Sequence, residues 1–179
     1  QYRLTLLKGS VRETWLLGNN THVVLYDASD FGSFSAPRVW WMFRVFGHTS
    51  VSVLDGGFKN WLTEGHPVIY QKCKSAIGLF LFISDTEPGH IPGSINMPFP
   101  SFLDSTSGLE RPVEELKKLF QQAGVDMQKP FWVTCCSGVT ACHIALAAHL
   151  CGHPGVCLYD GAWAEWFTRA KCDLYYYKF

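Results

Sequence analysis

A cysteine at the start of a loop of small residues is the feature of this sequence best suited to chemistry. Residues 131–134 predict a short apolar strand, residues 135–140 a loop that opens on Cys135, and residues 141–150 an amphipathic helix. In this order the thiol faces backbone N–H groups at the positive end of a helix, and these stabilise a thiolate. We therefore expect Cys135 to have a lowered pKa and to be a nucleophile at neutral pH.

The rest of the loop supplies further candidate site residues. These are Cys136, Ser137, Gly138, Val139 and Thr140. Gly138 lets the backbone turn without a Cβ clash. The hydroxyl of Thr140 can point toward the sulfur or cap the following helix, and the sequence favours neither role. Cys136 either resolves an oxidised Cys135 or is a spectator, and the strain of vicinal disulfides favours the spectator.

Composition argues against several classes of partner. The 179 residues include 15 basic and 15 acidic side chains, so a formal net charge of zero argues against nucleic acid or an anionic membrane surface. The apolar run Leu79–Ile83 is far too short to span a bilayer. No targeting segment is visible, and a start at Gln1 without Met or a hydrophobic leader is typical of a fragment or a processed form.

The cysteines predict free thiols rather than a disulfide framework. Seven is an odd number, and the spacing resembles no framework, so we expect reduced thiols in an intracellular protein. Cys142, Cys151 and Cys157 lie in apolar contexts typical of core thiols. The Cys and His residues between positions 135 and 153 lack paired ligand spacing, so we expect no metal site and no cofactor.

The elements that position this loop occur twice. Each half predicts a strand, a loop, a helix, a second strand, a turn and a second helix, in segments 23–27, 37–46, 51–54 and 58–62 and again in 131–134, 141–150, 156–159 and 163–169. Gly47, Asp55 and Trp61 stand 105 positions before Gly152, Asp160 and Trp166. Asp27 occupies the position that Cys135 has in the second copy, once a longer first loop is allowed for. This duplication predicts an α/β protein with a parallel sheet in each half, flanked by helices.

Several charged residues have structural interpretations. Asp55 and Asp160 precede turn glycines and are expected to hydrogen-bond the turn and the start of the next helix. Arg38 and Arg44 lie on one predicted helix, where they can face a neighbouring carboxylate, and we do not assign them as ligands. Residues 89–98 predict a turn that enters a short strand, and residues 112–122 an amphipathic helix.

These motifs together resemble the rhodanese superfamily. The active-site loop and helix Cys135–His143 follow a Gly89-His-Ile-Pro-Gly93 turn and precede the segment Tyr159-Asp-Gly-Ala-Trp163-Ala-Glu-Trp166. The segments 36–48 and 52–61 are similar to the inactive half of the two-domain thiosulfate and 3-mercaptopyruvate sulfurtransferases. The resemblance implies tandem rhodanese-like domains with an incomplete first one: a partial, catalytically inactive domain at 1–71, a shortened linker at 72–88 and a catalytic domain at 89–179.

The resemblance implies a sulfurtransferase. In this family the cysteine that matches Cys135 takes a sulfane sulfur from a small anionic donor, thiosulfate or 3-mercaptopyruvate, and becomes a persulfide. An acceptor such as cyanide, a thiol or thioredoxin then removes the sulfur. The amides from Cys136 to Thr140 are expected to cradle the persulfide anion as an oxyanion hole does. The family's usual location implies the mitochondrion or the cytoplasm.

Two features leave an alternative open. Rhodaneses usually have basic residues just after the nucleophile, whereas this chain has Cys136-Ser137, and Ser137 favours 3-mercaptopyruvate as donor. The segment Ser75–Glu87 contains no basic residue where the family has substrate-binding arginines. The alternative function is therefore a catalytically impaired, rhodanese-fold sulfur carrier or regulatory binding module. A cysteine phosphatase is excluded because Ala141 occupies the position of its phosphate-binding arginine.

Overall fold

The computed structural model describes residues 21–68 and 89–169. Its first half contains β1 (Val23–Leu25), α1 (Ala36–Val45), β2 (Val51–Val53) and α2 (Gly57–Thr63). The two strands are parallel, with Val23 beside Val51 and Leu25 beside Val53, so α1 is the crossover that parallel strands require. Gly47 ends α1 in a left-handed conformation (φ 86°), and its N–H donates to the carbonyl of Arg44.

The second half repeats this unit and adds two elements before it. These are the short 3-10 helix η2 (Phe99–Phe102) and α3 (Val113–Gln122). The repeated unit then consists of β3 (Trp132–Val133), α4 (Ala141–Leu150), β4 (Cys157–Leu158) and α5 (Ala162–Arg169), with β3 parallel to β4. The predicted strand after the turn at 92–93 is wrong, since the described chain there stays irregular and continues into η2. Pro98 and Pro100 in this stretch lack the N–H groups that strand pairing uses.

The backbone repeats the predicted duplication closely. Helix α4 begins and ends 105 positions after α1. Gly57 and Ala162, related by the same offset, both have positive φ, at 58° and 55°. The α/β class with a parallel sheet in each half is confirmed, with two strands described in each sheet. The expected domain boundaries remain a prediction, and the linker 72–88 lies outside the described residues.

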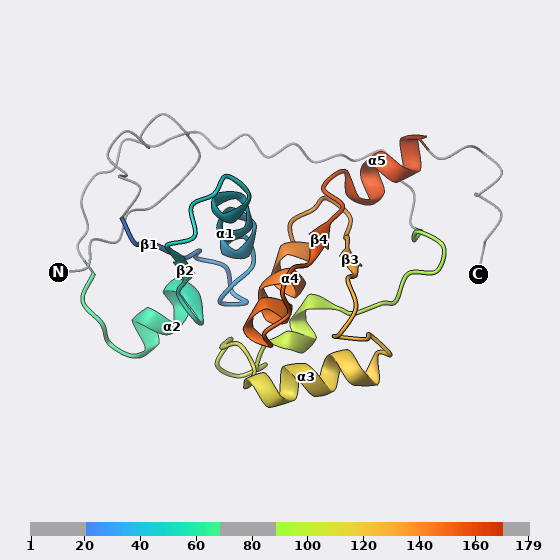
Figure 1. The fold of residues 1–179 in the computed structure, drawn as a ribbon. Coiled ribbons are helices and arrows are strands. Elements are labelled where there is room, and N and C mark those ends of the chain that lie inside the picture. The colour runs from blue at the N-terminus through green and yellow to red at the C-terminus, as the bar shows by residue number, and fades with distance from the viewer. Residues whose placement is uncertain (1–20, 69–88, 170–179) are drawn as a thin grey trace.

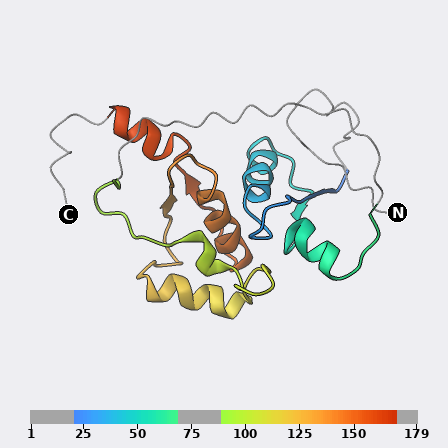
Figure 2. The ribbon, with the colours of Figure 1, turned by 180° about the vertical axis from the view of Figure 1, so that it is seen from behind.

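Helix α4 of the second half packs between α1 of the first half and the β3–β4 sheet of its own half. Figures 1 and 2 show it beside α1 on one side and beside the β3–β4 sheet on the other. Seven of its ten residues are buried, many of them alanines that allow close packing: Ala141, Cys142, His143, Ala145, Leu146, Ala147 and Ala148. The prediction of an amphipathic helix is therefore wrong. An apolar helix with most of its residues buried belongs to the core rather than to the surface.

The two halves share part of their hydrophobic core. Leu146 of α4 packs in the same cluster as Val23, Leu25, Trp40 and Val51 of the first half. A second cluster joins Phe102, Leu116 and Phe120 to the opposite side of α4. Among the described residues no helix has the length and the apolar character needed to cross a membrane.

Candidate active site

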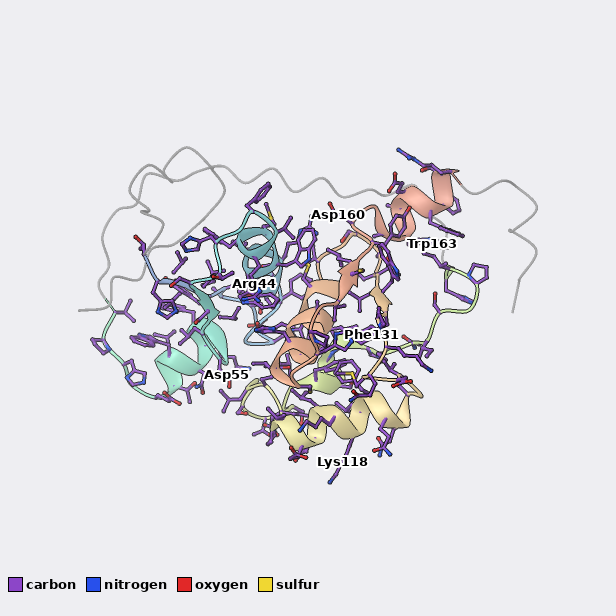
Figure 3. The ribbon with its side chains drawn as sticks, in the orientation of Figure 1. Arg44, Asp55, Lys118, Phe131, Asp160 and Trp163 are labelled. Atoms are coloured by element: carbon purple, nitrogen blue, oxygen red, sulfur yellow. The ribbon has the colours of Figure 1, made fainter. Side chains whose placement is uncertain are left out.

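Cys135 lies two residues after β3, at the end of the parallel sheet that faces the start of α4. The backbone around it is held by the first turn of α5. The N–H of Trp163 donates to the carbonyl of Cys135 at 2.9 Å, and the N–H of Ala164 donates to the carbonyl of Cys136 at 3.3 Å. Asp160 and Trp163, both labelled in Figure 3, mark this end of the molecule, where β4 leads into α5. The loop is therefore tied to the neighbouring connection as well as to its own helix.

The sulfur of Cys135 is surrounded by hydrogen-bond donors. Burial by itself would raise the pKa of this thiol. The Thr140 hydroxyl and the N–H groups of Ala141, Ser137 and Gly138 nevertheless lower it below its ordinary value. The N–H of Gly138 lies 3.1 Å from Sγ. This geometry stabilises a sulfur anion at the start of α4 and makes Cys135 the best-prepared nucleophile of the described chain.

The structure distinguishes between the two roles considered for Thr140. As the residue that precedes α4, it makes no side-chain capping bond. Its hydroxyl instead acts on the thiol of Cys135 and helps to lower the pKa of that group. Ala141, which is not among the predicted site residues, adds its N–H to the cradle because it is the first residue of α4 and its N–H has no partner within the helix.

Replacing Thr140 by valine is expected to raise the pKa of Cys135. The variant keeps the shape of the side chain but loses a hydrogen bond that favours the thiolate. Alkylation of Cys135 by iodoacetamide at neutral pH should therefore slow by roughly three- to tenfold. The rate is measured as a function of pH, with the label located by peptide mass spectrometry. Thr140→Ser, which retains the hydroxyl, is the matched control, and equal slowing in both variants would contradict this role.

The neighbouring thiol of Cys142 is not activated as Cys135 is. Cys142 is fully buried, and burial raises its pKa to about 11, while its thiol lies 3.2 Å from the carbonyl oxygen of Gly138. The side chains of Cys136 and Ser137 are exposed, and Val139 directs its carbonyl to the N–H of Cys142 in the first turn of α4. The five cysteines in the described residues are all free.

The sequence predicts core positions for Cys142, Cys151 and Cys157, and no metal site among the Cys and His residues between positions 135 and 153. The core position of Cys142 is confirmed, but Cys157 is exposed, because on the short strand β4 it is the neighbouring Leu158 whose side chain packs against the core. Across residues 21–68 and 89–169, no group of three His, Cys, Asp or Glu side chains is arranged to hold a metal ion.

The first half contains a matching cradle that holds a carboxylate instead of a thiol. One oxygen of Asp27 accepts the N–H groups of Phe34, Ser35 and Ala36 at 2.8–2.9 Å, and the other accepts the N–H of Ser29 at 3.0 Å. Burial raises the pKa of Asp27, but these hydrogen bonds outweigh it and the pKa is lowered. The structurally equivalent loop of the first half is thus already occupied by the protein's own anion.

An arginine of the first half reaches the loop of the second. Nη1 of Arg38, on α1, lies 2.5 Å from Oδ1 of Asp160 and 3.4 Å from the carbonyl oxygen of Gly138. The expectation that Arg38 faces a carboxylate is met, but Asp160 was expected to serve its own turn. Asp55 also departs from that expectation, since Oδ1 accepts the N–H of Glu110 at 2.7 Å. These partners are 55 or more positions apart, so no local pattern indicates them.

The fold and the loop define a class of protein: a duplicated α/β chain in which one copy cradles a cysteine and the other an aspartate. A family model described as "Rhodanese-like domain" matches residues 3–64 and 83–169. The chain belongs to this family, and the resemblance seen in its motifs is confirmed.

Named relatives agree with this assignment. The chain is 45% identical over 192 aligned positions to thiosulfate sulfurtransferase of Gallus gallus, with 86% of this chain and 66% of the relative covered. It is 45% identical over 195 positions to 3-mercaptopyruvate sulfurtransferase of Homo sapiens, with 87% and 65% covered. The chain thus spans just under two thirds of the length of these curated relatives.

Solved structures share the fold. The crystal structure of SseA from Escherichia coli, described as showing the "Rhodanese" fold and catalytic mechanism of 3-mercaptopyruvate sulfotransferases, is 29% identical with a TM-score of 0.63. The match covers 82% of this chain and 68% of SseA.

Proposed function

We propose that this protein is a sulfurtransferase that moves a sulfane sulfur from a small anionic donor to a thiophilic acceptor through a persulfide on Cys135. The observation that carries the proposal is the ring of donors around Sγ, which lowers the pKa of Cys135 while that of Cys142 is raised. Relatives named thiosulfate and 3-mercaptopyruvate sulfurtransferase support the same reaction class.

The cradle suits both steps of such a transfer. The Cys135 thiolate attacks the outer sulfur of thiosulfate, a new S–S bond forms, and sulfite leaves with the electrons of the broken bond. With 3-mercaptopyruvate the C–S bond breaks instead, and the carbon fragment takes up a proton and leaves as pyruvate. In either case the persulfide carries a negative charge one atom further from the protein chain. The N–H groups of Ser137, Gly138 and Ala141 are placed to stabilise it.

In the second step an acceptor attacks the terminal sulfur. Cyanide leaves as thiocyanate, whereas a thiol such as that of thioredoxin becomes a persulfide, and Cys135 is released as a thiolate. We place the protein in the mitochondrion or the cytoplasm, where such acceptors occur. No nucleic acid, membrane, metal or cofactor takes part in the proposed reaction.

A second candidate function is that of a sulfur carrier with weak donor recognition, or of a regulatory binding module with the same fold. The specific observation in its favour concerns charge. Arg38 contacts the active-site loop, but its cation is matched by the carboxylate of Asp160. A doubly charged donor therefore gains little from Arg38, and the exposed side chains of Cys136 and Ser137 add no cation.

Sulfur loading of the full chain tests the proposal. The protein is incubated separately with thiosulfate, 3-mercaptopyruvate and a low-molecular-weight persulfide. Intact mass then reports the gain of one sulfur atom and its discharge to cyanide. Cys135→Ser and Cys157→Ser are the matched pair of variants, since Cys157 is an exposed thiol outside the loop. We expect one of the two anionic donors to load the wild type and Cys157→Ser, and Cys135→Ser to stay unloaded.

The outcomes separate the candidates. Loading by the persulfide alone favours the carrier over the sulfurtransferase. Loading of Cys135→Ser to the wild-type extent would overturn the role of Cys135. No loading by any of the three compounds, in a folded chain with an alkylatable Cys135, would overturn both the sulfurtransferase and the carrier.

A further inference from the structure

We propose that Arg38, a residue of the half without the nucleophile, is a positioning residue that holds the active-site loop of the other half in its anion-binding conformation. The proposal rests on the function proposed for Cys135 and adds the residue that regulates the geometry of its cradle. Arg38 lies on α1, and the loop lies 100 positions further along the chain.

The contacts of Arg38 converge on one loop residue. Its Nη1 lies 3.4 Å from the carbonyl oxygen of Gly138 and 4.0 Å from Sγ of Cys142. The Cys142 thiol lies 3.2 Å from that same carbonyl oxygen. Two donors therefore hold the carbonyl of Gly138 from the side of α1 and α4.

Gly138 transmits this restraint to the nucleophile. Its N–H lies 3.1 Å from Sγ of Cys135, while its carbonyl faces Arg38 and Cys142. Gly138 has φ 80° and is buried, so it has little room to adjust. Fixing the carbonyl orients the residue, and the orientation of the residue aims its N–H at the sulfur.

The guanidinium is itself held firmly. It pairs with Asp160, stacks over the ring of Trp41 at 4.9 Å, and has only 24% of its side chain exposed. Because Asp160 lies in the turn after β4 and Arg38 comes from α1, the pair bridges both halves of the protein beside the loop. Asp160 also balances the charge, so the effect of Arg38 passes through geometry rather than through attraction of a donor.

Arg44 provides a matched control on the same helix. Its guanidinium also stacks on a tryptophan, lying 5.1 Å from the ring of Trp40. It occupies the last turn of α1, where it faces His149 of α4, and within the described residues it makes no hydrogen bond or ion pair with the loop. Figure 3 labels Arg44 between α1 and α4, below the end of the molecule that carries Asp160.

The test measures the alkylation rate of Cys135 against pH in the full chain for Arg38→Gln, Arg38→Lys and Arg44→Gln. Fragment mass spectra distinguish the label on Cys135 from that on the adjacent Cys136. We expect the midpoint of the Cys135 profile to rise by about 0.5–1 pH unit in both Arg38 variants, since the weakened cradle favours the thiolate less. The Arg44→Gln midpoint should match the wild type.

Arg38→Lys makes the test specific for position rather than charge. Lysine keeps the positive charge but lacks the planar guanidinium that lies over the ring of Trp41 and fixes the position of Nη1 beside Asp160 and Gly138. A wild-type midpoint in folded Arg38→Lys would overturn the proposal, as would an equal shift in Arg44→Gln. If Arg38→Gln does not fold, Arg38→Lys carries the test.

The readout requires no sulfur donor. A chain that fails to load sulfur but shows the expected shifts would contradict the proposed function alone. A chain that loads sulfur with an unchanged midpoint in both Arg38 variants would contradict the inference alone.

Discussion

Replacing Asp27 by asparagine is expected to lower the free energy of unfolding at pH 7 by about 2–4 kcal/mol. The carboxylate of Asp27 accepts four backbone N–H groups, three in the loop before α1 and one at its first residue. Asparagine offers one acceptor oxygen and turns an NH₂ group toward donors, which leaves half-buried N–H groups without partners. Urea unfolding of the two proteins, followed by circular dichroism, measures the difference.

Asp104→Asn is the matched control for this effect. Its carboxylate also accepts N–H groups from its own turn, those of Thr106 and Ser107, but the residue is exposed. Water can replace the lost acceptor there, so we expect a loss within about 1 kcal/mol. Equal losses of unfolding free energy in Asp27→Asn and Asp104→Asn would show that the hydrogen bonds around Asp27 stabilise the protein no more than those of an exposed turn.

The effect of Asp27 should also depend on pH. The pKa of Asp27 in the folded chain lies below its ordinary value of about 3.9, so the unfolded chain binds its proton first as the pH falls. Its stabilising contribution is therefore fully present above about pH 5 and is lost as the pH falls through the folded pKa. The difference in the free energy of unfolding between the wild type and Asp27→Asn should therefore become smaller in acid. A difference that does not change with pH would contradict the role of the ionised carboxylate.

Gly138→Ala is expected to slow both the alkylation of Cys135 and any sulfur loading by roughly ten- to a hundredfold. Gly138 has φ 80°, a conformation that costs alanine about 1–2 kcal/mol. An added Cβ would also lie 3.0 Å from the carbonyl oxygen of Asp160 and 3.4 Å from Nη1 of Arg38. To relieve the backbone strain and these close contacts, residue 138 has to shift. The shift moves its N–H away from Sγ of Cys135, to which it donates.

Gly124→Ala separates backbone strain from crowding. Gly124 has a similar φ of 77°, follows α3, and has no atom within 4 Å of the position of an added Cβ. We expect a comparable loss of stability but wild-type alkylation of Cys135. If Gly138→Ala reacts at the wild-type rate, the loop tolerates a Cβ, and the N–H of Gly138 is not required for the reactivity of Cys135.

The sequence by itself determined the repeated elements and the place of the nucleophile. Apolar periodicity and glycine punctuation are local signals, so the helix 141–150 was predicted to its exact bounds and Gly47 and Gly152 were recognised as helix ends. The match of Asp27 with Cys135 also followed from spacing, because duplicated units keep their order. The short strands were predicted one or two residues too long, since their ends depend on pairing partners.

Only the tertiary structure decided what surrounds the loop. The burial of seven of the ten residues of α4 depends in part on the packing of α1 against it, and no pattern within α4 indicates that neighbour. The pairing of Arg38 with Asp160 joins residues more than 100 positions apart. The hydroxyl of Thr140 had two possible partners close in sequence, and the geometry of the loop selected the sulfur. Local patterns encode elements, whereas these contacts arise only when the two halves pack together.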